Sequence, residues 1–524
     1  MGIPSYFSHI VKRHRNIIKK YSGFQINNLY LDSNSIIYDC LRNIEYENDH
    51  DFENALYVAI CEKILEYIKT LNPDTAVLIA FDGVAPIAKL EQQRNRRYKS
   101  WFVKELMEKK WQTDPTWDAT AITPGTKFMD NIGIYVNNYF SNTEIRKSNN
   151  LQELNIIVSS PNEAGEGEHK IFQYIRDQHQ YHSETTTAIY GLDADLIMLT
   201  LNHLHISKNL FLFRETPHFI TSIDKTLSPN ENYLMDINEL SEVISEDLTK
   251  NNTSISDYIF LCFFLGNDFM PHFPALNIRT SGIDILMKAY KETLGNSNQF
   301  LTNGADICWK NVWKLVKYLA DNEYDYLLDE YKKRDRKKPP PIYSEKGTKE
   351  EFEEKLQQLP MKDRNIEKYI NPRENGWDKR YYGQLFEMDI DEERKRDICI
   401  NYLEGLEWTF KYYTEGCIDW RWHYKYDYAP LLKDLIQFIP YVDEEFLTKK
   451  APDPVHKYVQ LGYVLPRKSL NLLPPDLYKT LITEHSDLYR LDCEFKWSFC
   501  KYFWESHVVM PAIDIDLLER VIAV

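Results

Sequence analysis

Short apolar runs early in this chain end directly before acidic residues. Residues 29–31 (Leu-Tyr-Leu) are followed by Asp32, and residues 76–81 (Ala-Val-Leu-Ile-Ala-Phe) are followed by Asp82. Longer amphipathic segments separate these runs, and strands that alternate with helices predict an α/β fold with a mostly parallel central sheet. Because ligands gather at the carboxyl ends of parallel strands, we expect the acids to meet at one edge of that sheet.

Paired carboxylates follow two further apolar runs. Residues 154–158 precede Gly-Glu-Gly-Glu at 165–168, and residues 187–190 precede Asp-Ala-Asp at 193–195. Acids crowded in this way repel one another and raise each other's pKa unless cations hold them. Hard oxygen ligands at that density suit Mg²⁺ or Mn²⁺. The pattern therefore predicts a metal-dependent site for phosphoryl transfer.

A further acid, in Gly266-Asn-Asp-Phe269, follows the apolar run 258–265. An isolated acid at the end of a strand is most often a helix cap or a turn residue. That explanation weakens when five separate segments present acids at equivalent positions. The predicted catalytic and metal-binding residues are Asp32, Asp82, Glu166, Glu168, Asp193, Asp195 and Asp268.

A row of donors begins seven residues after Asp82. Lys89, Gln93, Arg96 and Arg97 share one face if this segment is a helix. Such a row can bind a terminal phosphate, with arginine supplying bidentate geometry, although a solvated basic surface is the common alternative. The net charge of −16 argues against backbone binding of nucleic acid unless the positive charge is local, and this row supplies it.

Aromatic residues are dense between 408 and 428, where Trp and Tyr alternate with Arg and Lys. Most rings in such a segment are core, but the interleaved basic residues leave room for one ring to stack on a base. Residues 332–341 (KKRDRKKPPP) change the composition abruptly, and we expect no helix to continue into them. The predicted division is a nuclease core at 1–330, a basic and proline-rich linker or loop at 331–360, and a helix-rich region at 361–524.

The composition indicates a soluble intracellular protein. No apolar run approaches the roughly 18 residues that span a bilayer, and the eight cysteines form no C-x-x-C pair. We expect a cytoplasmic monomer that does not bind membranes, and leave a nuclear location open. The basic run at 332–338 is either an import signal or a solvated linker.

Several of these motifs together resemble the XRN family of 5′→3′ exoribonucleases. Its first conserved region is matched by Met1-Gly-Ile-Pro4, Asp32-Ser-Asn-Ser35, Asp82-Gly-Val-Ala-Pro86 and residues 165–170, 190–196 and 266–269. Its second is matched by residues 408–430, 464–466 and 473–475. The chain resembles a short form without the long C-terminal extension of the large members, and its richness in Asn, Ile, Lys and Tyr is typical of an AT-rich genome, viral genomes included.

The resemblance implies a flap-nuclease or PIN-like core in which the seven acids hold two Mg²⁺ ions, with Mn²⁺ as a substitute. It implies that the row from Lys89 to Arg97 forms a pocket for a 5′-monophosphate. Tyr38 stands where the family commonly has a histidine that stacks on the first base. A tryptophan of the second region faces that base, and either Trp420 or Trp422 fits this role.

The expected activity is hydrolysis of single-stranded RNA with a 5′-monophosphate to 5′-mononucleotides, as part of RNA decay. Decapping or pyrophosphatase enzymes would act upstream. Two alternatives remain: a flap-type DNA nuclease with a similar acid layout, and a catalytically inactive RNA-binding scaffold. The basic row and the tryptophan-rich region argue against the first, and the complete set of acids argues against the second.

Overall fold

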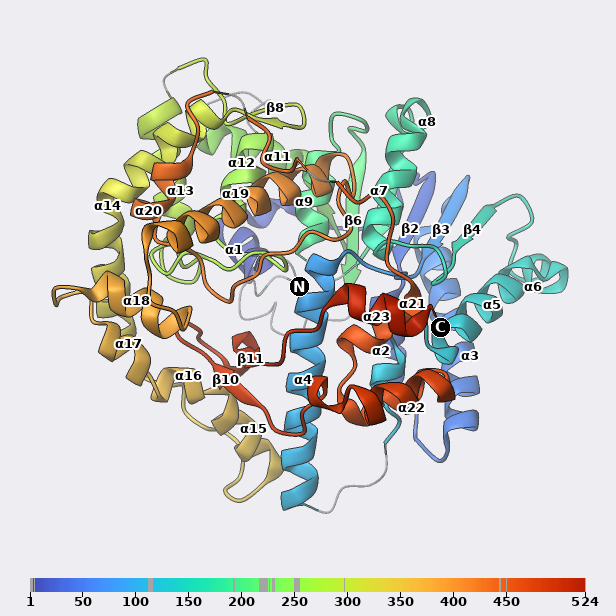
Figure 1. Ribbon diagram of the computed structural model, residues 1–524. Coiled ribbons are helices and arrows are strands. Elements are labelled where there is room, and N and C mark those ends of the chain that lie inside the picture. Colours follow the sequence, from blue (N-terminus) through green and yellow to red (C-terminus); the bar gives the residue numbers. More distant parts are fainter. Residues whose placement is uncertain are drawn as a thin grey trace.

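A seven-stranded sheet forms the centre of the computed structural model (Figure 1). The structure describes residues 3, 5–111, 116–191, 194–215, 225, 227–228, 231–248, 255–295, 297–442, 444–448 and 450–523. The strand order is β1-β7-β6-β5-β2-β3-β4. The strands are β1 (Ile18–Lys20), β2 (Asn28–Asp32), β3 (Ala76–Ala80), β4 (Asn155–Ser159), β5 (Thr187–Tyr190), β6 (Leu210–Glu215) and β7 (Asn232–Asp236).

The inner strands of this sheet are parallel. Asn28 in β2 aligns with Ala76 in β3 on one side and with Thr187 in β5 on the other. β4 and β6 extend the parallel set, and β7 pairs antiparallel with both of its neighbours, β6 and β1. The predicted α/β fold with a mostly parallel sheet is confirmed. As a result, the carboxyl ends of β5, β2, β3 and β4 lie side by side along one edge.

Helices cover both faces of the sheet. Leu29 and Leu31 of β2 join a cluster with helices α2 (Asn34–Leu41), α3 (Asp49–Leu71) and α5 (Lys127–Ser141). Tyr30 faces a larger cluster that includes α7 (Gly167–Asp177), α9 (Asp195–Asn202), α12 (Ile255–Phe263) and α19 (Glu392–Thr414). Strands buried on both faces explain why the apolar runs are nearly continuous. No helix in the described part of the chain is both long and apolar enough to cross a bilayer.

The described helices up to residue 263 are α1 (Tyr6–Arg13), α2 (Asn34–Leu41), α3 (Asp49–Leu71), α4 (Ile87–Lys110), α5 (Lys127–Ser141), α6 (Thr143–Ser148), α7 (Gly167–Asp177), α8 (His179–Ser183), α9 (Asp195–Asn202), α11 (Ile237–Asp247) and α12 (Ile255–Phe263). Those that follow are α13 (Gly282–Tyr290), α14 (Trp309–Arg336), α15 (Lys349–Gln357), α16 (Leu359–Lys362), α17 (Asn365–Ile370), α18 (Trp377–Leu385), α19 (Glu392–Thr414), α20 (Leu432–Leu435), α21 (Lys457–Val464), α22 (Pro475–Glu484) and α23 (Ile515–Ile522).

The helix-rich C-terminal region packs directly on the first part of the chain. Val84, just before α4, and Ile87 and Leu90 at its start share a buried cluster with α21, α22 and α23. Figure 1 shows α4 crossing the middle of the molecule, with α21 and α23 beside its N-terminal end. The second region therefore positions the helix that carries the basic row.

One sequence expectation is wrong at the basic run. Helix α14 continues through Lys332 and Lys333 and ends at Arg336, so only the proline-rich half of this run lacks helical structure. The reason is a buried ion pair: Arg334 Nη2 lies 2.7 Å from Glu367 Oε1, and both side chains are almost fully buried. The basic run that suggested a solvated linker therefore includes one arginine, Arg334, that packs against another part of the chain.

Gly83 joins the loops that carry two of the predicted acids. Its N–H donates to the carbonyl of Gly165 at 2.8 Å, and Gly165 N–H donates to the carbonyl of Val84 at 2.8 Å. A Cβ at position 83 would lie 1.7 Å from the Glu163 carbonyl oxygen, so no other residue fits without moving the backbone. Gly165 has φ +106°, which also favours glycine.

We predict that Gly83→Ala lowers the free energy of unfolding by about 2–3 kcal/mol, because the added methyl group overpacks a backbone contact. Gly383→Ala is the matched control. Position 383 lies inside α18, and a Cβ added there would meet no atom within 4 Å, so this change should stabilise the protein by up to about 1 kcal/mol. Urea denaturation measures both. Equal stability of the two variants would contradict the close backbone approach at Gly83.

Candidate active site

Five of the predicted acids lie at the carboxyl edge of the parallel strands. Asp32 is the last residue of β2, and Asp82 follows β3 by two residues. Glu166 is the N-cap of α7, which follows β4, and Glu168 lies in the first turn of α7. Asp195 begins α9, after β5. Asp193 lies outside the described residues.

Short contacts bring the strand-end acids together around Gly167. The Gly167 N–H donates to Asp82 Oδ1 at 2.7 Å. A Cβ at position 167 would lie 2.8 Å from Asp32 Oδ1 and 3.0 Å from the carbonyl oxygen of Ala80, so glycine is needed for this approach. Carboxylates at the N-terminal end of α7 also interact favourably with its dipole. The Gly-Glu-Gly-Glu motif therefore positions the carboxylates of Glu166 and Glu168, and its glycine at position 167 leaves room for those of Asp32 and Asp82.

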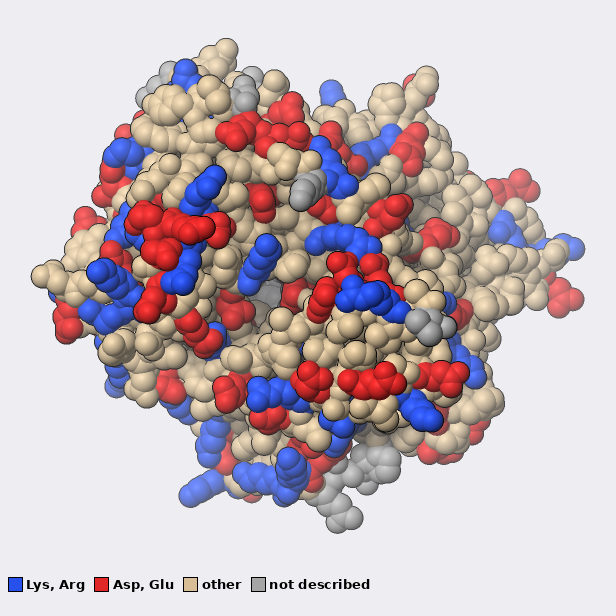
Figure 2. Space-filling model, in the orientation of Figure 1, with Lys and Arg blue, Asp and Glu red and all other residues tan. Residues whose placement is uncertain are grey.

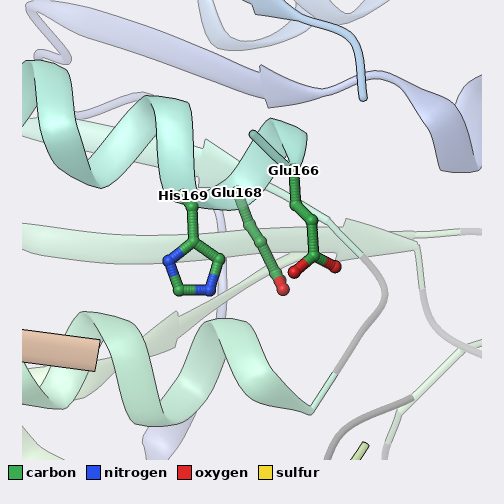
Figure 3. Close-up of side chains that lie close together, drawn as sticks. All are labelled: Glu166, Glu168 and His169. Carbon is green, nitrogen blue, oxygen red and sulfur yellow. The ribbon is translucent and has the colours of Figure 1, made fainter. Parts of the chain in front are cut away.

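One carboxylate oxygen in the cluster has no hydrogen-bond partner. Glu168 Oε2 is buried and unpartnered among the described residues, as is Nδ1 of the neighbouring His169. Ligand atoms of Glu166, Glu168 and His169 lie within 4.8 Å of one another, and Figure 3 shows the three side chains on the same side of the chain. A buried anionic oxygen without a donor is costly, and a cation would satisfy it. The donor set fits a divalent metal ion.

The electrostatics of the cluster also indicate a cation site. Burial and the nearby Asp195 raise the pKa of Glu168 well above its ordinary value. Burial and Asp268 raise the pKa of Asp195 to about 6. Burial also raises the pKa of Glu166, although Lys89 opposes this. These acids thus resist full ionisation until positive charge is supplied.

Lys89 supplies part of that charge. Its Nζ lies 2.5 Å from Glu166 Oε2 and 2.8 Å from Asp268 Oδ2. Burial alone would lower the pKa of Lys89, but the carboxylates of Asp268 and Glu166 raise it well above its ordinary value. Burial would likewise raise the pKa of Asp268, and Lys89 instead holds it at about 2. Predicted as a phosphate ligand, Lys89 here contacts the acids.

Two consecutive tyrosines of α19 reach the acids from the second region. Tyr412 Oη donates to Glu166 Oε1 at 2.8 Å, and Tyr413 Oη donates to Asp195 Oδ1 at 2.7 Å. The Tyr412 ring also stacks on the His169 ring, with centroids 3.7 Å apart. Sequence reasoning noted these rings only as aromatic density and missed His169 as a neighbour of the acids. Nothing in the linear spacing signals that these rings lie next to the carboxylates.

The other members of the basic row divide between two sides of α4. Gln93 and Arg97 are buried, and Gln93 Oε1 and Arg97 Nε have no hydrogen-bond partner among the described residues. Arg97 lies close enough to Tyr38 for the two to interact, and its burial lowers the pKa of its guanidinium to about 10, so it remains cationic at neutral pH. Arg96 is exposed and lines a cavity of about 760 Å³ that also reaches Asp268.

The two tryptophan candidates occupy different environments. Trp422 is 8% exposed, stacks on Trp408 with centroids 5.2 Å apart, and donates from Nε1 to Glu404. Trp420 is half-buried, and its carbonyl accepts a hydrogen bond from the N–H of Ile87, the first residue of α4. Trp422 is therefore committed to packing, whereas Trp420 lies beside the N-terminus of the helix that carries the basic row.

Acidic and basic side chains are intermixed on the face shown in Figure 2. Although the net charge is −16, the acidic residues on this face do not form one continuous acidic patch. Local positive charge beside the carboxylates is compatible with an acidic protein.

Two family models together match most of the chain. The family model described as "XRN 5'-3' exonuclease N-terminus" matches residues 1–216, and the one described as "Xrn1 helical domain" matches residues 249–366 and 341–523. The chain is 28% identical to 5'-3' exoribonuclease 1 of Saccharomyces cerevisiae, over 98% of this chain and 42% of that protein. It is 26% identical to 5'-3' exoribonuclease 2 of Candida albicans, over 98% of this chain and 71% of that protein.

The chain thus spans less than half of the yeast relative and about 71% of the Candida one. Among solved structures, a similar chain is the catalytic core of Rad2 in complex with DNA substrate, with a TM-score of 0.34 and 13% identity over 64% of this chain and 77% of that chain. The two family models together match residues 1–216 and 249–523, which is most of the chain. The chain therefore belongs to the XRN family of 5′-3′ exonucleases.

Proposed function

We propose that this protein is a 5′→3′ exoribonuclease that hydrolyses single-stranded RNA with a 5′-monophosphate and releases 5′-mononucleotides. The observation that carries the proposal is the buried carboxylate cluster, with an unpartnered Glu168 oxygen, next to the donor row of α4. The curated relatives named above are exoribonucleases, which supports RNA as the substrate.

The carboxylates would hold two divalent ions, Mg²⁺ or Mn²⁺. When bound, such ions lower the pKa of an attacking water and neutralise the leaving 3′ oxygen. The ligands would come from the acids named in the sequence: Asp32, Asp82, Glu166, Glu168, Asp193, Asp195 and Asp268. Tyr412 and Tyr413 donate to two of these carboxylates from outside the ligand set, and hydrogen bonds of this kind fix the orientation of metal ligands.

Lys89 links the carboxylates to the end-binding row. Two of its three donors face Glu166 and Asp268, and we assign the third to a substrate phosphate. In this role it would hold the cut at a fixed distance from the 5′ end. The same ammonium offsets part of the carboxylate charge.

Gln93 and Arg97 would bind the 5′-phosphate from the buried side of α4, with Arg97 donating from its unpartnered Nε and Gln93 donating from its side-chain amide nitrogen. A pocket closed in this way should exclude a cap or a triphosphate by size. Tyr38, adjacent to Arg97, would stack on the first base, and Trp420 fits the facing position better than the packed Trp422.

We predict that Tyr412→Phe raises the Mg²⁺ concentration for half-maximal RNA decay by about 10- to 100-fold, because Glu166 loses the donor that orients it. Binding of Mn²⁺, followed by electron paramagnetic resonance, should weaken in parallel. The control is Tyr381→Phe, since Tyr381 Oη is equally buried but donates to the Ala429 carbonyl. An identical Mg²⁺ requirement in both variants would show that the Tyr412 hydroxyl only fills space.

Arg97→Gln should reduce the preference for 5′-phosphate over 5′-hydroxyl RNA by about 10- to 100-fold in kcat/KM, the value of a charge-assisted hydrogen bond. Arg94→Gln on the same helix is the control. Arg94 is also buried, but it donates to the Pro511 carbonyl and packs on Tyr463, so its loss should cost stability without changing the end preference. An unchanged ratio in Arg97→Gln would refute end recognition by this face of α4.

A further inference from the structure

A second cavity, of about 280 Å³, lies against the C-terminal end of α14 and is distinct from the carboxylate site. We call it the basic pocket. One acidic residue, Glu330, lines this pocket. The six basic residues that line it are Arg279, Lys333, Arg334, Lys337, Arg364 and Lys501. Three of these residues, Lys333, Arg334 and Lys337, come from the basic run whose role the sequence left open.

Ion pairs fix the walls of the basic pocket. Glu367 accepts from Arg334 Nη2 at 2.7 Å and from Arg364 Nε at 2.6 Å. Arg364 Nη1 also lies 2.9 Å from Asp335 Oδ1. Lys333 and Arg279 pair with Asp329 and Glu505. Four of the six basic residues are thus held in place by carboxylates.

Among the described residues, three donor groups around the cavity have no carboxylate partner: the ammonium groups of Lys337 and Lys501, and one nitrogen of Arg364. Lys337 and Lys501 form no ion pair with any residue in the described ranges, and burial together with the charge of Lys501 lowers the pKa of Lys337. Arg364 is only 7% exposed, and its Nη2 is buried without a hydrogen-bond partner. Lys337 and Lys501 line the same cavity as the unpartnered guanidinium nitrogen of Arg364, and this set of unpaired donors fits an anion.

An aromatic pair adjoins the pocket. The rings of Tyr502 and Trp504 are 6.2 Å apart and nearly parallel, at 16°. The guanidinium carbon of Arg279 lies 5.8 Å from each ring centroid, and the Lys501 ammonium lies 4.4 Å from that of Tyr502. Trp504 is 42% exposed, unusually high for a tryptophan. Exposed rings with interleaved cations are typical of surfaces that bind single-stranded nucleic acid.

The basic pocket adjoins the larger cavity that reaches Asp268. Asn277 and Arg279 line both cavities, and Trp504 lines the larger one, which also reaches Asp268 and Arg96. Asn277 and Arg279 thus separate two neighbouring cavities, one with Asp268 and Trp504 and the other with Lys337 and Lys501.

We propose that the basic pocket and the Tyr502–Trp504 pair bind the RNA strand on the 3′ side of the scissile bond, with a backbone phosphate in the pocket and a base on Trp504. This inference rests on the proposed function. The ligand chemistry is a phosphate group, which a free phosphorylated small molecule could also supply. The aromatic pair and the neighbouring cavity that reaches Asp268 favour a phosphate within the substrate strand.

Binding of RNA to Asp195→Asn enzyme, in which decay is blocked, tests this proposal. Adding Lys337→Ala and Lys501→Ala should weaken binding of a long unstructured 5′-phosphorylated RNA about tenfold and reduce the salt slope by about 1.4, the value for two lost phosphate contacts. Binding of a 5′-phosphorylated trinucleotide, which has only one phosphate on the 3′ side of the scissile bond, should be unchanged. Trp504→Ala should weaken binding of the long RNA about tenfold, with Trp504→Phe retaining most of it.

The matched control is Lys332→Ala with Lys338→Ala, which removes two exposed charges from the same segment that line neither cavity. Equal effects of the two double variants, or equal effects on long and short RNA, would overturn the proposal. A second result would also overturn it: pyrophosphate raises the thermal stability of the wild type but not of the Lys337/Lys501 variant, while RNA binding is the same in both. The pocket would then hold a free anion. Absence of RNA decay by the wild type, with the length-dependent binding intact, would instead refute the proposed activity.

Discussion

The structure around the active site depends on the neutralisation of crowded carboxylates. Six acids from five chain segments lie around one point in the described part of the chain, and burial raises the pKa of Glu166, Glu168 and Asp195. Lys89 offsets part of this repulsion from the first turn of α4, in contact with Glu166 and Asp268. Such a cluster is unfavourable unless it is compensated, and we assign the remaining compensation to the metal ions.

Helix α4 connects the carboxylates to the groups proposed to bind the substrate end. At one end it contacts the acids through Lys89, and further along it presents Gln93 and Arg97 on a buried side and Arg96 to the open cavity. The C-terminal region packs on the start of this helix and contributes Tyr412 and Tyr413 to the carboxylates. Catalysis by the N-terminal region alone would therefore lack the groups that orient Glu166 and Asp195.

The fold class and the acid cluster could be predicted from the sequence because both follow from local rules. Apolar runs of strand length define the sheet, and parallel strands bring their carboxyl ends to one edge, so Asp32, Asp82 and Glu166 could be placed together without a structure. The contacts of Tyr412 and Tyr413 could not be predicted, because they depend on how α19 packs against α7 and α9. The continuation of α14 through the basic run escaped prediction for the same reason, since Glu367 lies far along the chain from Arg334.

The fate of a 5′-labelled, 5′-monophosphorylated RNA tests the central claim most directly. With Mg²⁺ present, the wild-type protein should release the label as a 5′-mononucleotide from the earliest time point, with no labelled oligonucleotide intermediates. Asp195→Asn or addition of EDTA should slow this release by about 10³-fold, the rate equivalent of several kcal/mol of lost metal stabilisation. Labelled oligonucleotides as first products, or equal rates with and without Mg²⁺, would contradict a metal-dependent exonuclease that acts from the 5′ end.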